Sequence, residues 1–369
     1  MKKYKFNEFI ILHDKKRIPL SSIERKKRQG NYRYYGAQGV IDHINDYIFD
    51  GEFVLLAEDG ENLKSKKQNI AQYVTGKFWV NNHAHIITTT DICRLKYFYY
   101  LINTIDVSEY ITGSAQPKLS QISMNKMEFE IPEIKVQDKI LSILNAIDKK
   151  ITLNNEINKN LLQQAQALYN HSFPYTVSDI LPEGWRLGTV SEIIEIHDSK
   201  RIPLSGAQRD KMKKKIYPYY GAASLMDYVD EYIFDGKYLL LGEDGTVVDD
   251  AGFPILQYVW GQFWVNNHAH ILTGKLGYNV ESLYMLFKQT PVRSIVTGAV
   301  QPKISQVNLK SIPVVIPPTN LIRAFNNQVN EMFALIRNIE VENKSLSTLR
   351  DSLLPKLMSG EIDLSVLDL

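Results

Sequence analysis

The chain has 369 residues, of which 44% are hydrophobic and 23% charged, and its formal net charge is +2. This composition is typical of folded globular proteins and excludes a disordered or polycationic chain, while the length predicts two or three domains. A single cysteine, Cys93, excludes an intrachain disulfide and a multi-cysteine zinc site, and it predicts a reducing, cytoplasmic location. The basic start MKKYKFNEF is followed by no apolar segment, and no stretch approaches the roughly 18 apolar residues that span a membrane. Neither a signal peptide nor a membrane helix is therefore expected.

Positive charge is concentrated in short clusters, although the net charge is small. Such clusters are most often solvated surface, but within one domain they can also follow the phosphates of a nucleic acid. In chain order they are Lys15-Lys16-Arg17, Arg25-Lys26-Lys27-Arg28, Lys64 with Lys66 and Lys67, and Lys211 with Lys213-Lys214-Lys215.

The segment 1–132 predicts a strand-rich globule. Runs such as YIFD, FVLLAED and KFWVNNHAHIITT are rich in Tyr, Phe, Ile and Val and are broken by Gly, Asn and Asp, which is typical of short strands joined by turns. If FWVNNHAHI (Phe78–Ile86) is one strand, the alternation of side chains places Trp79, Asn81, His83 and His85 on the same face.

The segment 133–175 predicts one long amphipathic helix. It has no Gly or Pro before Pro174, and its apolar residues from Ile140 to Leu168 are spaced three and four apart. About 36 residues at roughly 1.5 Å per residue give a helix of about 54 Å, which is longer than a small globule needs. Such a helix must bury its apolar stripe against a partner.

The rest of the chain repeats this unit at a nearly constant offset. FWVNNHAHI recurs letter for letter at Phe263–Ile271, an offset of 185 (263 − 78 = 185), and TGSAQPKLSQI from Thr112 matches TGAVQPKISQV from Thr297 at the same offset. HDKKRIPL matches HDSKRIPL at an offset of 184. A period this long indicates a duplicated domain, because solenoid repeats have units of about 20–50 residues. We therefore expect an α+β fold with two copies of a mixed α/β, strand-rich globule followed by a long helix. The four predicted segments are 1–132, 133–175, 176–317 and 318–369.

The second helix, which begins after Pro318 and ends before Gly360, is the obvious partner for the first. Asn158 and Asn343 occupy matching positions in the two apolar stripes (158 + 185 = 343). They are either buried, where asparagine fixes the register of helix pairing, or simply exposed.

The motifs of common enzyme classes are absent from the sequence. It contains no GxxxxGK[ST], no GxSxG, no glycine-rich fingerprint after a strand and no [DN]PP[YFW] methyltransferase motif. Cys93 has Tyr278 at the matching position, so it is a weak candidate for a nucleophile. The repeated Glu58-Asp59-Gly60 and Glu243-Asp244-Gly245 are expected to be solvated turns that close a strand.

The His-x-His of each copy leaves a metal site open as an alternative. Two histidines on one face of a strand could share zinc or iron if carboxylates or a further histidine completed the ligand set. Strand histidines are more often hydrogen-bonded structural residues, so we predict no metal and keep a metal-dependent enzyme as the alternative. The residues concerned are His83, His85, His268 and His270, with the recurring His13, Asp14, His197 and Asp198.

Taken together, these motifs resemble the specificity (S) subunit of type I restriction-modification enzymes. The resemblance rests on VNNHAHII and VNNHAHIL late in each globule, on TGSAQPKLSQI and TGAVQPKISQV near its end, and on IP or IPPT before each helix. LPEGWRLGTVSEI (Leu181–Ile193) resembles the usual opening of a target-recognition domain, and LRDSLLPKLMSGEIDL (Leu349–Leu364) resembles the usual C-terminus. The first globule lacks the LPEGW lead-in, so we expect either a short first strand or a late start of the sequence.

The resemblance implies a non-catalytic DNA-recognition subunit. Each globule would be a target-recognition domain that reads one half of a bipartite site in double-stranded DNA, and the two helices would form an antiparallel coiled coil that sets the distance between the half-sites. The helices would also dock DNA adenine methyltransferase subunits, expected to be two, and a restriction translocase subunit would join them. No cofactor is expected on this chain, since S-adenosylmethionine, ATP and Mg²⁺ belong to the partner subunits. A coiled-coil interaction protein without DNA specificity is the other alternative.

Segments that differ between the copies are expected to encode different half-sites, whereas identical segments are expected to be framework. The largest differences lie at Ser21–Asn31 against Ser205–Ile216 and at Glu61–Ala71 against Thr246–Leu256. Lysine and arginine suit phosphate contacts and guanine edges. The predicted DNA-binding residues are Lys15, Lys16, Arg17, Arg25, Lys26, Lys27, Arg28, Lys64, Lys66, Lys67 and Lys118 in the first copy, and Lys200, Arg201, Arg209, Lys211, Lys213, Lys214, Lys215 and Lys303 in the second.

Overall fold

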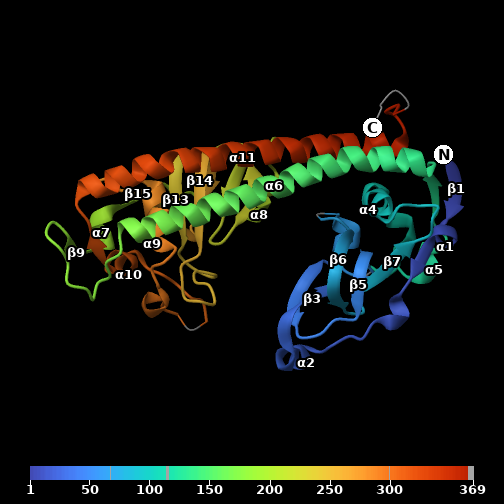
Figure 1. The fold of residues 1–369 in the computed structure, drawn as a ribbon, viewed down its shortest axis with the longest axis horizontal. Coiled ribbons are helices and arrows are strands. Elements are labelled where there is room, and N and C mark those ends of the chain that lie inside the picture. Colours follow the sequence, from blue (N-terminus) through green and yellow to red (C-terminus); the bar gives the residue numbers. More distant parts are fainter. Residues whose placement is uncertain (67, 114–115, 299, 365–369) are drawn as a thin grey trace. The chain divides into compact units, whose positions relative to one another are not determined.

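The computed structural model describes residues 1–66, 68–113, 116–298 and 300–364 (Figure 1). The chain divides into two compact units, Met1–Leu153 with Asn343–Leu369 and Asn154–Glu342. Each unit holds one globule and a part of both long helices, and each is described by itself below. The four segment boundaries predicted from the sequence stay predictions.

The first unit is built around a six-stranded sheet that is accompanied by short helices. Its strands are β1 (Lys2–Lys5), β2 (Ile10–Leu12), β3 (Gln29–Gly36), β4 (Gly39–Ile44), β5 (Phe49–Ala57), β6 (Ala71–Val80), β7 (Ala84–Thr89) and β8 (Glu128–Ile131), and its short helices are α1 (Phe6–Phe9), α2 (Ser22–Lys27), α3 (Asn62–Ser65), α4 (Leu95–Thr104) and α5 (Gln121–Met124). Six strands pair in the order β2-β7-β5-β6-β3-β4, and β1 pairs with β8 in a separate sheet. All these pairs are antiparallel except β3 with β6.

The second unit repeats this topology with its own strands and helices. The strands are β9 (Arg186–Thr189), β10 (Ile194–Ile196), β11 (Tyr217–Tyr220), β12 (Leu225–Val229), β13 (Phe234–Gly242), β14 (Leu256–Val265), β15 (Ala269–Gly274) and β16 (Pro313–Ile316), and the short helices are α7 (Val190–Ile193), α8 (Gly206–Asp210), α9 (Val280–Phe287) and α10 (Gln306–Lys310). The six-stranded order is β10-β15-β13-β14-β11-β12, and β9 pairs with β16. Because β1 and β9 both have four residues, the expectation of a short first strand in the first globule is wrong.

The two globules share their strand register as well as their topology. Phe49 pairs with Phe78 in the first, and Phe234 pairs with Phe263 in the second. Strands β5 and β13 also show the same burial along their length, with four buried residues at the end. Since a slip of one residue would turn this buried set outward, the hydrophobic pattern fixes the register in both copies. The predicted tandem α+β fold is confirmed.

The repeated phrase FWVNNHAHI is not a single strand, so the expectation that it alternates along one face is wrong. In the first copy it contains the end of β6, a turn at residues 81–83 and the start of β7. The side-chain oxygen of Asn81 accepts a hydrogen bond from the backbone amide of His83 at 2.8 Å. Asparagine stabilises turns in this way, by bonding the backbone two residues on. The turn places His83 at the surface and His85 in the interior.

The long helices are α6 (Ile134–Ser172) and α11 (Thr319–Ser359). In the first unit, an early part of α6 packs with the end of α11: Asp148 accepts a hydrogen bond from Arg350 at 3.1 Å. In the second unit, the end of α6 packs with the start of α11, where the rings of Tyr169 and Phe325 lie 5.3 Å apart. Because Asn154 contacts Glu342 and Tyr169 contacts Phe325, the two segments run antiparallel in the second unit, while a coiled coil as such stays a prediction. Among the described residues, no helix is both long and apolar enough to cross a membrane.

The asparagine that is buried between the helices is Asn154. It is 1% exposed, and its side-chain nitrogen donates a hydrogen bond to Glu342 at 2.8 Å. For Asn158 and Asn343, the sequence analysis left two alternatives, buried or exposed. Both residues are half-buried, so neither alternative describes them. Comparison of the two sequence copies does not point to Asn154, because the matching position of the second helix (154 + 185 = 339) holds Ile339.

Candidate DNA-binding surface

A compact group of charged side chains ties together the end of the sheet in the first globule. Asp14 follows β2, Glu58 follows β5 and His85 lies in β7. His85 Nδ1 lies 2.6 Å from Asp14 Oδ2, and its Nε2 lies 2.8 Å from the carbonyl oxygen of Leu119. Arg17 Nη1 donates to Glu58 Oε2 at 2.7 Å. The group therefore joins two strands to the loop before α5.

The second globule contains the same group with nearly the same distances. His270 Nδ1 lies 2.6 Å from Asp198 Oδ2, and its Nε2 lies 2.8 Å from the carbonyl oxygen of Ile304. Arg201 Nη1 donates to Glu243 Oε2 at 2.6 Å. Because this network is identical in both copies, it cannot distinguish one DNA half-site from another. We therefore assign it to the framework of the globule.

The carboxylates of this group are held in their charged form. Burial by itself raises the pKa of Asp14, but the hydrogen bonds from His85, from the amide of Ile86 and from Gln121 together outweigh it, and the pKa lies below its ordinary value. Burial also raises the pKa of Glu58, and the hydrogen bonds from Arg17 and Lys118 together lower it below its ordinary value. The solvated turn expected at Glu58 is therefore wrong, because the fold brings Arg17, 41 residues earlier in the chain, against that carboxylate.

The metal alternative, as the sequence suggested it, does not fit this geometry. The side chain of His83 is 46% exposed and pairs with Asp59 at 2.7 Å, whereas that of His85 is 1% exposed and pairs with Asp14. The two histidines therefore do not converge on one site. Ligand atoms of Asp14, Glu58 and His85 do lie within 4.8 Å of one another. However, an arginine and a lysine already contact these carboxylates, so their negative charge is neutralised by the protein.

Arg17 and Arg201, which were predicted to contact DNA, have partners inside the protein. Arg17 donates to the carbonyl oxygens of Asn82 and Ala84 in addition to Glu58. Its side chain is only 15% exposed and that of Arg201 only 12%. A phosphate contact by either arginine stays a prediction, and these internal bonds argue against it.

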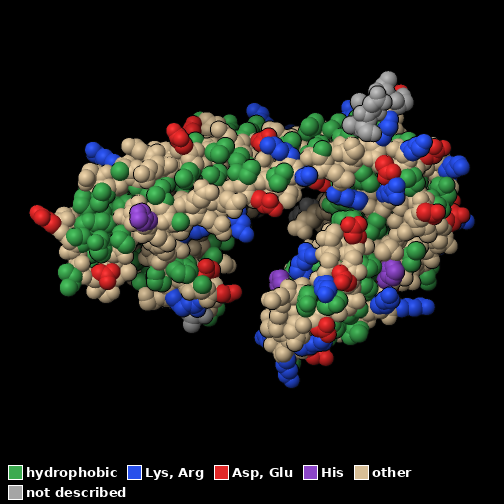
Figure 2. All heavy atoms as spheres, viewed as in Figure 1, with side chains coloured by type: hydrophobic (Ala, Val, Ile, Leu, Met, Phe, Trp, Pro, Cys, Tyr) green, Lys and Arg blue, Asp and Glu red, His purple; other side chains and the backbone are tan. Residues whose placement is uncertain are grey.

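The short helices α2 and α8 present the clearest basic surface. Each begins at a serine cap, Ser21 or Ser205, whose side chain accepts a backbone hydrogen bond. Arg25 fastens α2 to the sheet, since it bonds Asp42 at 2.8 Å and lies over the ring of Tyr34. Arg209 does the same in the second copy, with Asp227 and Tyr219. The lysines that follow Arg25 are exposed, and Figure 2 shows blue side chains at the tip of the first unit where Figure 1 labels α2.

The remaining predicted residues differ in how exposed and how tightly held their side chains are. Arg28 lies over the ring of Trp79 and bonds Asp46 at 3.2 Å, and Lys66 bonds Asp106 at 2.5 Å. The backbone amides of residues 213–215 all donate to Asp230, which pins that loop to the strand. Lys67 lies outside the described residues. The exposed members of the set are Lys15, Lys16, Lys26, Lys27, Lys64, Lys66, Lys118, Lys200, Lys211, Lys213, Lys214, Lys215 and Lys303.

Lys118 and Lys303 lie at the junction of the internal network and the surface. Lys118 Nζ lies 3.1 Å from Glu58 Oε1 and Lys303 Nζ 3.3 Å from Glu243 Oε1, yet about half of each side chain is exposed. Tyr34, by contrast, is fully buried, and its hydroxyl accepts a hydrogen bond from the amide of Leu20 at 2.9 Å. Tyr34 is therefore part of the packed framework of the first globule.

Comparison with known proteins gives a family and a fold. The family model described as "Type I restriction modification DNA specificity domain" matches residues 1–163 and 182–349. A protein of Haemophilus influenzae described as a type I restriction enzyme specificity subunit is 33% identical over 118 residues, which are 32% of this chain and 30% of that protein. The Type I restriction enzyme MjaIX specificity subunit of Methanocaldococcus jannaschii is 23% identical over 306 residues, 72% of this chain and 69% of that protein. The chain thus spans about a third of the first of these relatives.

A solved structure supports the fold over almost the whole chain. The crystal structure of a Type-I restriction-modification system S subunit from M. genitalium has a TM-score of 0.56 at 16% identity. The match covers 96% of this chain and 95% of that one. At this identity the likeness establishes the arrangement of strands and helices alone.

Proposed function

The chain belongs to the family of type I restriction modification DNA specificity domains, and from this premise we propose that each of its globules reads one half of a bipartite target in double-stranded DNA. The chain itself is a recognition subunit and not an enzyme. A metal-dependent enzyme and an interaction protein without DNA specificity are the alternatives that this proposal replaces.

The proposal rests on one contrast: the two globules share their internal framework but differ in their basic surface segments. The strand register and the buried charge network are the same in both copies. The basic segments around α2 and α8 differ: SSIERKKRQGN stands in one and SGAQRDKMKKKI in the other. Two similar frames that present different basic segments suit the recognition of two different half-sites, with lysines positioning the phosphates and nearby side chains reading bases.

The remaining parts of the proposal concern the complex. The paired helices set the distance between the half-sites and dock two DNA adenine methyltransferase subunits, and a restriction translocase subunit joins the assembly. S-adenosylmethionine, ATP and Mg²⁺ bind to those partners. The complex acts in the cytoplasm, where its DNA target and a reducing environment for Cys93 are found.

The experiment is a charge-removal series in the complex with its methyltransferase subunits. The double variant Lys26→Ala/Lys27→Ala should weaken DNA binding and reduce the slope of log affinity against log salt by about 0.9 for each phosphate that is no longer neutralised. The matched control is Lys2→Ala/Lys3→Ala, which removes the same charge from the exposed strand β1.

A result in which both double variants bind DNA with unchanged affinity and salt dependence would contradict the assignment of α2. If both variants weakened binding equally, the effect would be one of net charge, and the assignment would again be wrong. A third variant, Lys213→Ala/Lys214→Ala, tests the second copy in the same way, and it should weaken binding without altering protection of the half-site read by the first copy.

A further inference from the structure

In the second unit, a fully buried carboxylate joins the globule to a long helix. Glu281 of α9 accepts hydrogen bonds from Lys237 of β13 at 2.6 Å and from the hydroxyl of Tyr258 at 2.9 Å. Arg337 of α11 donates to the same tyrosine oxygen at 2.7 Å, and its Nη1 lies 3.5 Å from Glu281 Oε1. A cation of the helix therefore completes a charged group that belongs to the globule.

The first unit holds the same pair with its charges reversed. At the matching positions (offset 185), Glu52 supplies the anion from β5 and Lys96 supplies the cation from α4. The hydroxyl of Tyr73, the matching tyrosine, donates to Glu52 at 2.7 Å, and Lys96 Nζ lies 5.6 Å from the centre of the Tyr73 ring. The helix position that matches the arginine holds Thr152, which is exposed and carries no charge. Where the cation lies on α4 of the globule, the helix thus supplies none at this position.

A second contact between globule and helices is polar in the first unit only. Tyr100 of α4 donates its hydroxyl hydrogen to Asp148 of α6, and Arg350 of α11 donates to the same carboxylate at 3.1 Å. The matching positions of the second unit are apolar and fully buried, and they hold Met285, Phe333 and Ala165. Hydrogen bonds and charge in one unit are therefore replaced by apolar packing in the other.

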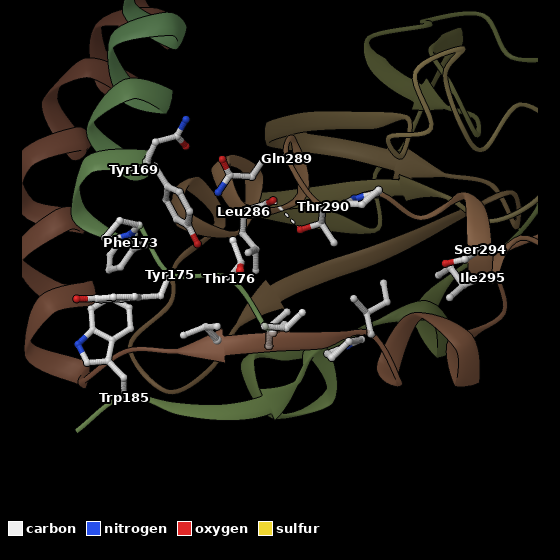
Figure 3. Close-up of a pocket in the computed structure, with 18 residues that line it drawn as sticks. Tyr169, Phe173, Tyr175, Thr176, Trp185, Leu286, Gln289, Thr290, Ser294 and Ile295 are labelled. Atoms are coloured by element: carbon white, nitrogen blue, oxygen red, sulfur yellow. Dashed lines mark hydrogen bonds between the residues drawn. The ribbon is translucent and has the colours of Figure 1, made fainter. Parts of the chain in front are cut away.

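The ends of the two long helices also differ in what they offer a globule. Figure 3 shows Tyr169, at the end of α6, beside Gln289 of the second globule, and both residues line one pocket. Gln166, three residues earlier on the helix, donates to Gln289 at 3.2 Å. The positions of α11 that match Tyr169 and Gln166 hold Leu354 and Asp351 (offset 185). Neither the ring nor the amide is therefore repeated at the end of α11.

These differences make an exchange of the globules unfavourable. If the first globule occupied the place of the second, Lys96 would face Arg337, and like charges brought together in a contact repel strongly. Tyr100, which is 4% exposed, would face Phe333 and leave its buried hydroxyl without a partner. In the reverse exchange, Asp148 would face an apolar side chain in place of its hydroxyl donor. Both exchanges therefore lose contacts that the native arrangement makes.

We propose that these contacts make each globule specific for the helix segments of its own unit, so that the surface of α6 and α11 in one unit docks one globule and rejects the other. The two globules therefore cannot exchange places. A duplicated or foreign globule can take either place only together with matching residues on the helices. The inference goes beyond the proposed function, since it does not depend on what the globules bind.

The first test reverses the charged pair of the second unit in the full chain. Lys237→Glu/Glu281→Lys gives this globule the charge order of the first and places a cation beside Arg337. In calorimetry, the melting temperature of the second unit should fall by at least about 4 °C, with faster hydrogen exchange in α9. Adding Arg337→Thr, which introduces the residue of the matching position, should recover at least half of this fall.

The matched control is the same reversal in the first unit. Glu52→Lys/Lys96→Glu exchanges the two charges where the helix has threonine at the matching position. Because no helix arginine is placed there to repel or attract the pair, the melting temperature of the first unit should change by less than about 2 °C.

A chimera tests the exchange of whole globules. Residues 186–316 are replaced in the full chain by a second copy of residues 2–131, which span the matching strands. This chimera should melt at least about 4 °C higher when the helices carry the residues that the first globule meets in its own unit. The three helix substitutions are Arg337→Thr, Phe333→Asp and Ala165→Arg.

The outcomes decide whether the helices select their globule. If the two charge reversals lowered the melting temperatures of their units equally, the pair would serve the globule alone and the inference would be wrong. It would also be wrong if Arg337→Thr gave no recovery, or if the helix substitutions did not stabilise the chimera. Should the double variant of the second unit fail to fold, folding of the triple variant would support the inference, and its failure to fold would overturn it.

Discussion

Replacing Asp14 by Asn should loosen the first unit and leave the second intact. The Asp14 side chain is only 5% exposed, and it accepts hydrogen bonds from His85 at 2.6 Å, from the amide of Ile86 at 2.9 Å and from Gln121 at 2.7 Å. Asparagine keeps the size of the side chain but removes its charge. It leaves the buried His85 and Arg17 facing a neutral group. The amide nitrogen of asparagine also cannot accept a hydrogen bond, as the carboxylate oxygen that it replaces does.

The cost follows from the burial of this group. Removing the acceptor of buried hydrogen bonds typically destabilises a protein by about 1–3 kcal/mol, because the buried donors are left without a partner. The first unit comprises Met1–Leu153 and Asn343–Leu369. For a unit in the size range of about 150–250 residues, each kcal/mol lowers the melting temperature by about 2–4 °C, so a fall of about 2–12 °C is expected.

The assay is calorimetry combined with hydrogen exchange on the full chain. Asp14→Asn should lower the melting temperature of one transition and speed exchange in β7, while β15 exchanges as before. Asp198→Asn is the matched variant in the second copy. It should speed exchange in β15, while β7 exchanges as before. A shift below about 2 °C, or equal loosening of β7 and β15 by either variant, would show that the network does not hold its own globule together.

Three further changes test other parts of the structure. Asp14 and Glu58 have folded-state pKa values below their ordinary ones. Their contribution to stability is therefore complete above the unfolded-state pKa near about 4 and is lost as the pH falls through the folded-state pKa. Urea unfolding from pH 7 to pH 3 should show this loss of stability, and a flat profile would contradict it. Arg337→Met removes a cation 3.5 Å from the fully buried Glu281, which keeps Lys237 at 2.6 Å, and should destabilise the second unit by about 1–3 kcal/mol in chemical denaturation, whereas an unchanged denaturation midpoint would contradict this role. Asn154→Ile, which introduces the residue found at the matching position of the second helix, should raise the melting temperature of the second unit by a few degrees, whereas a fall would show that the hydrogen bond of the asparagine outweighs the added apolar packing.

The sequence by itself determined the architecture of this protein. The nearly constant offset between matching phrases established the duplication, and apolar residues spaced three and four apart established both long helices, because these signals extend over much of the chain. The helix predicted at residues 133–175 runs from Ile134 to Ser172. The family followed from phrases such as VNNHAHII and TGSAQPKLSQI, which are local in the chain.

Only the tertiary structure decided what individual charged residues do. Arg17 and Lys16 are neighbours in one basic cluster, yet Arg17 is turned inward to Glu58 while Lys16 is exposed. FWVNNHAHI looks like one strand, but its Asn81 bonds the backbone in a turn and sends its two histidines to different surroundings. These outcomes depend on side chains that are distant in the chain and meet only when the sheet forms. Periodicity carries no information about such contacts, and for that reason the buried network emerged from the structure alone.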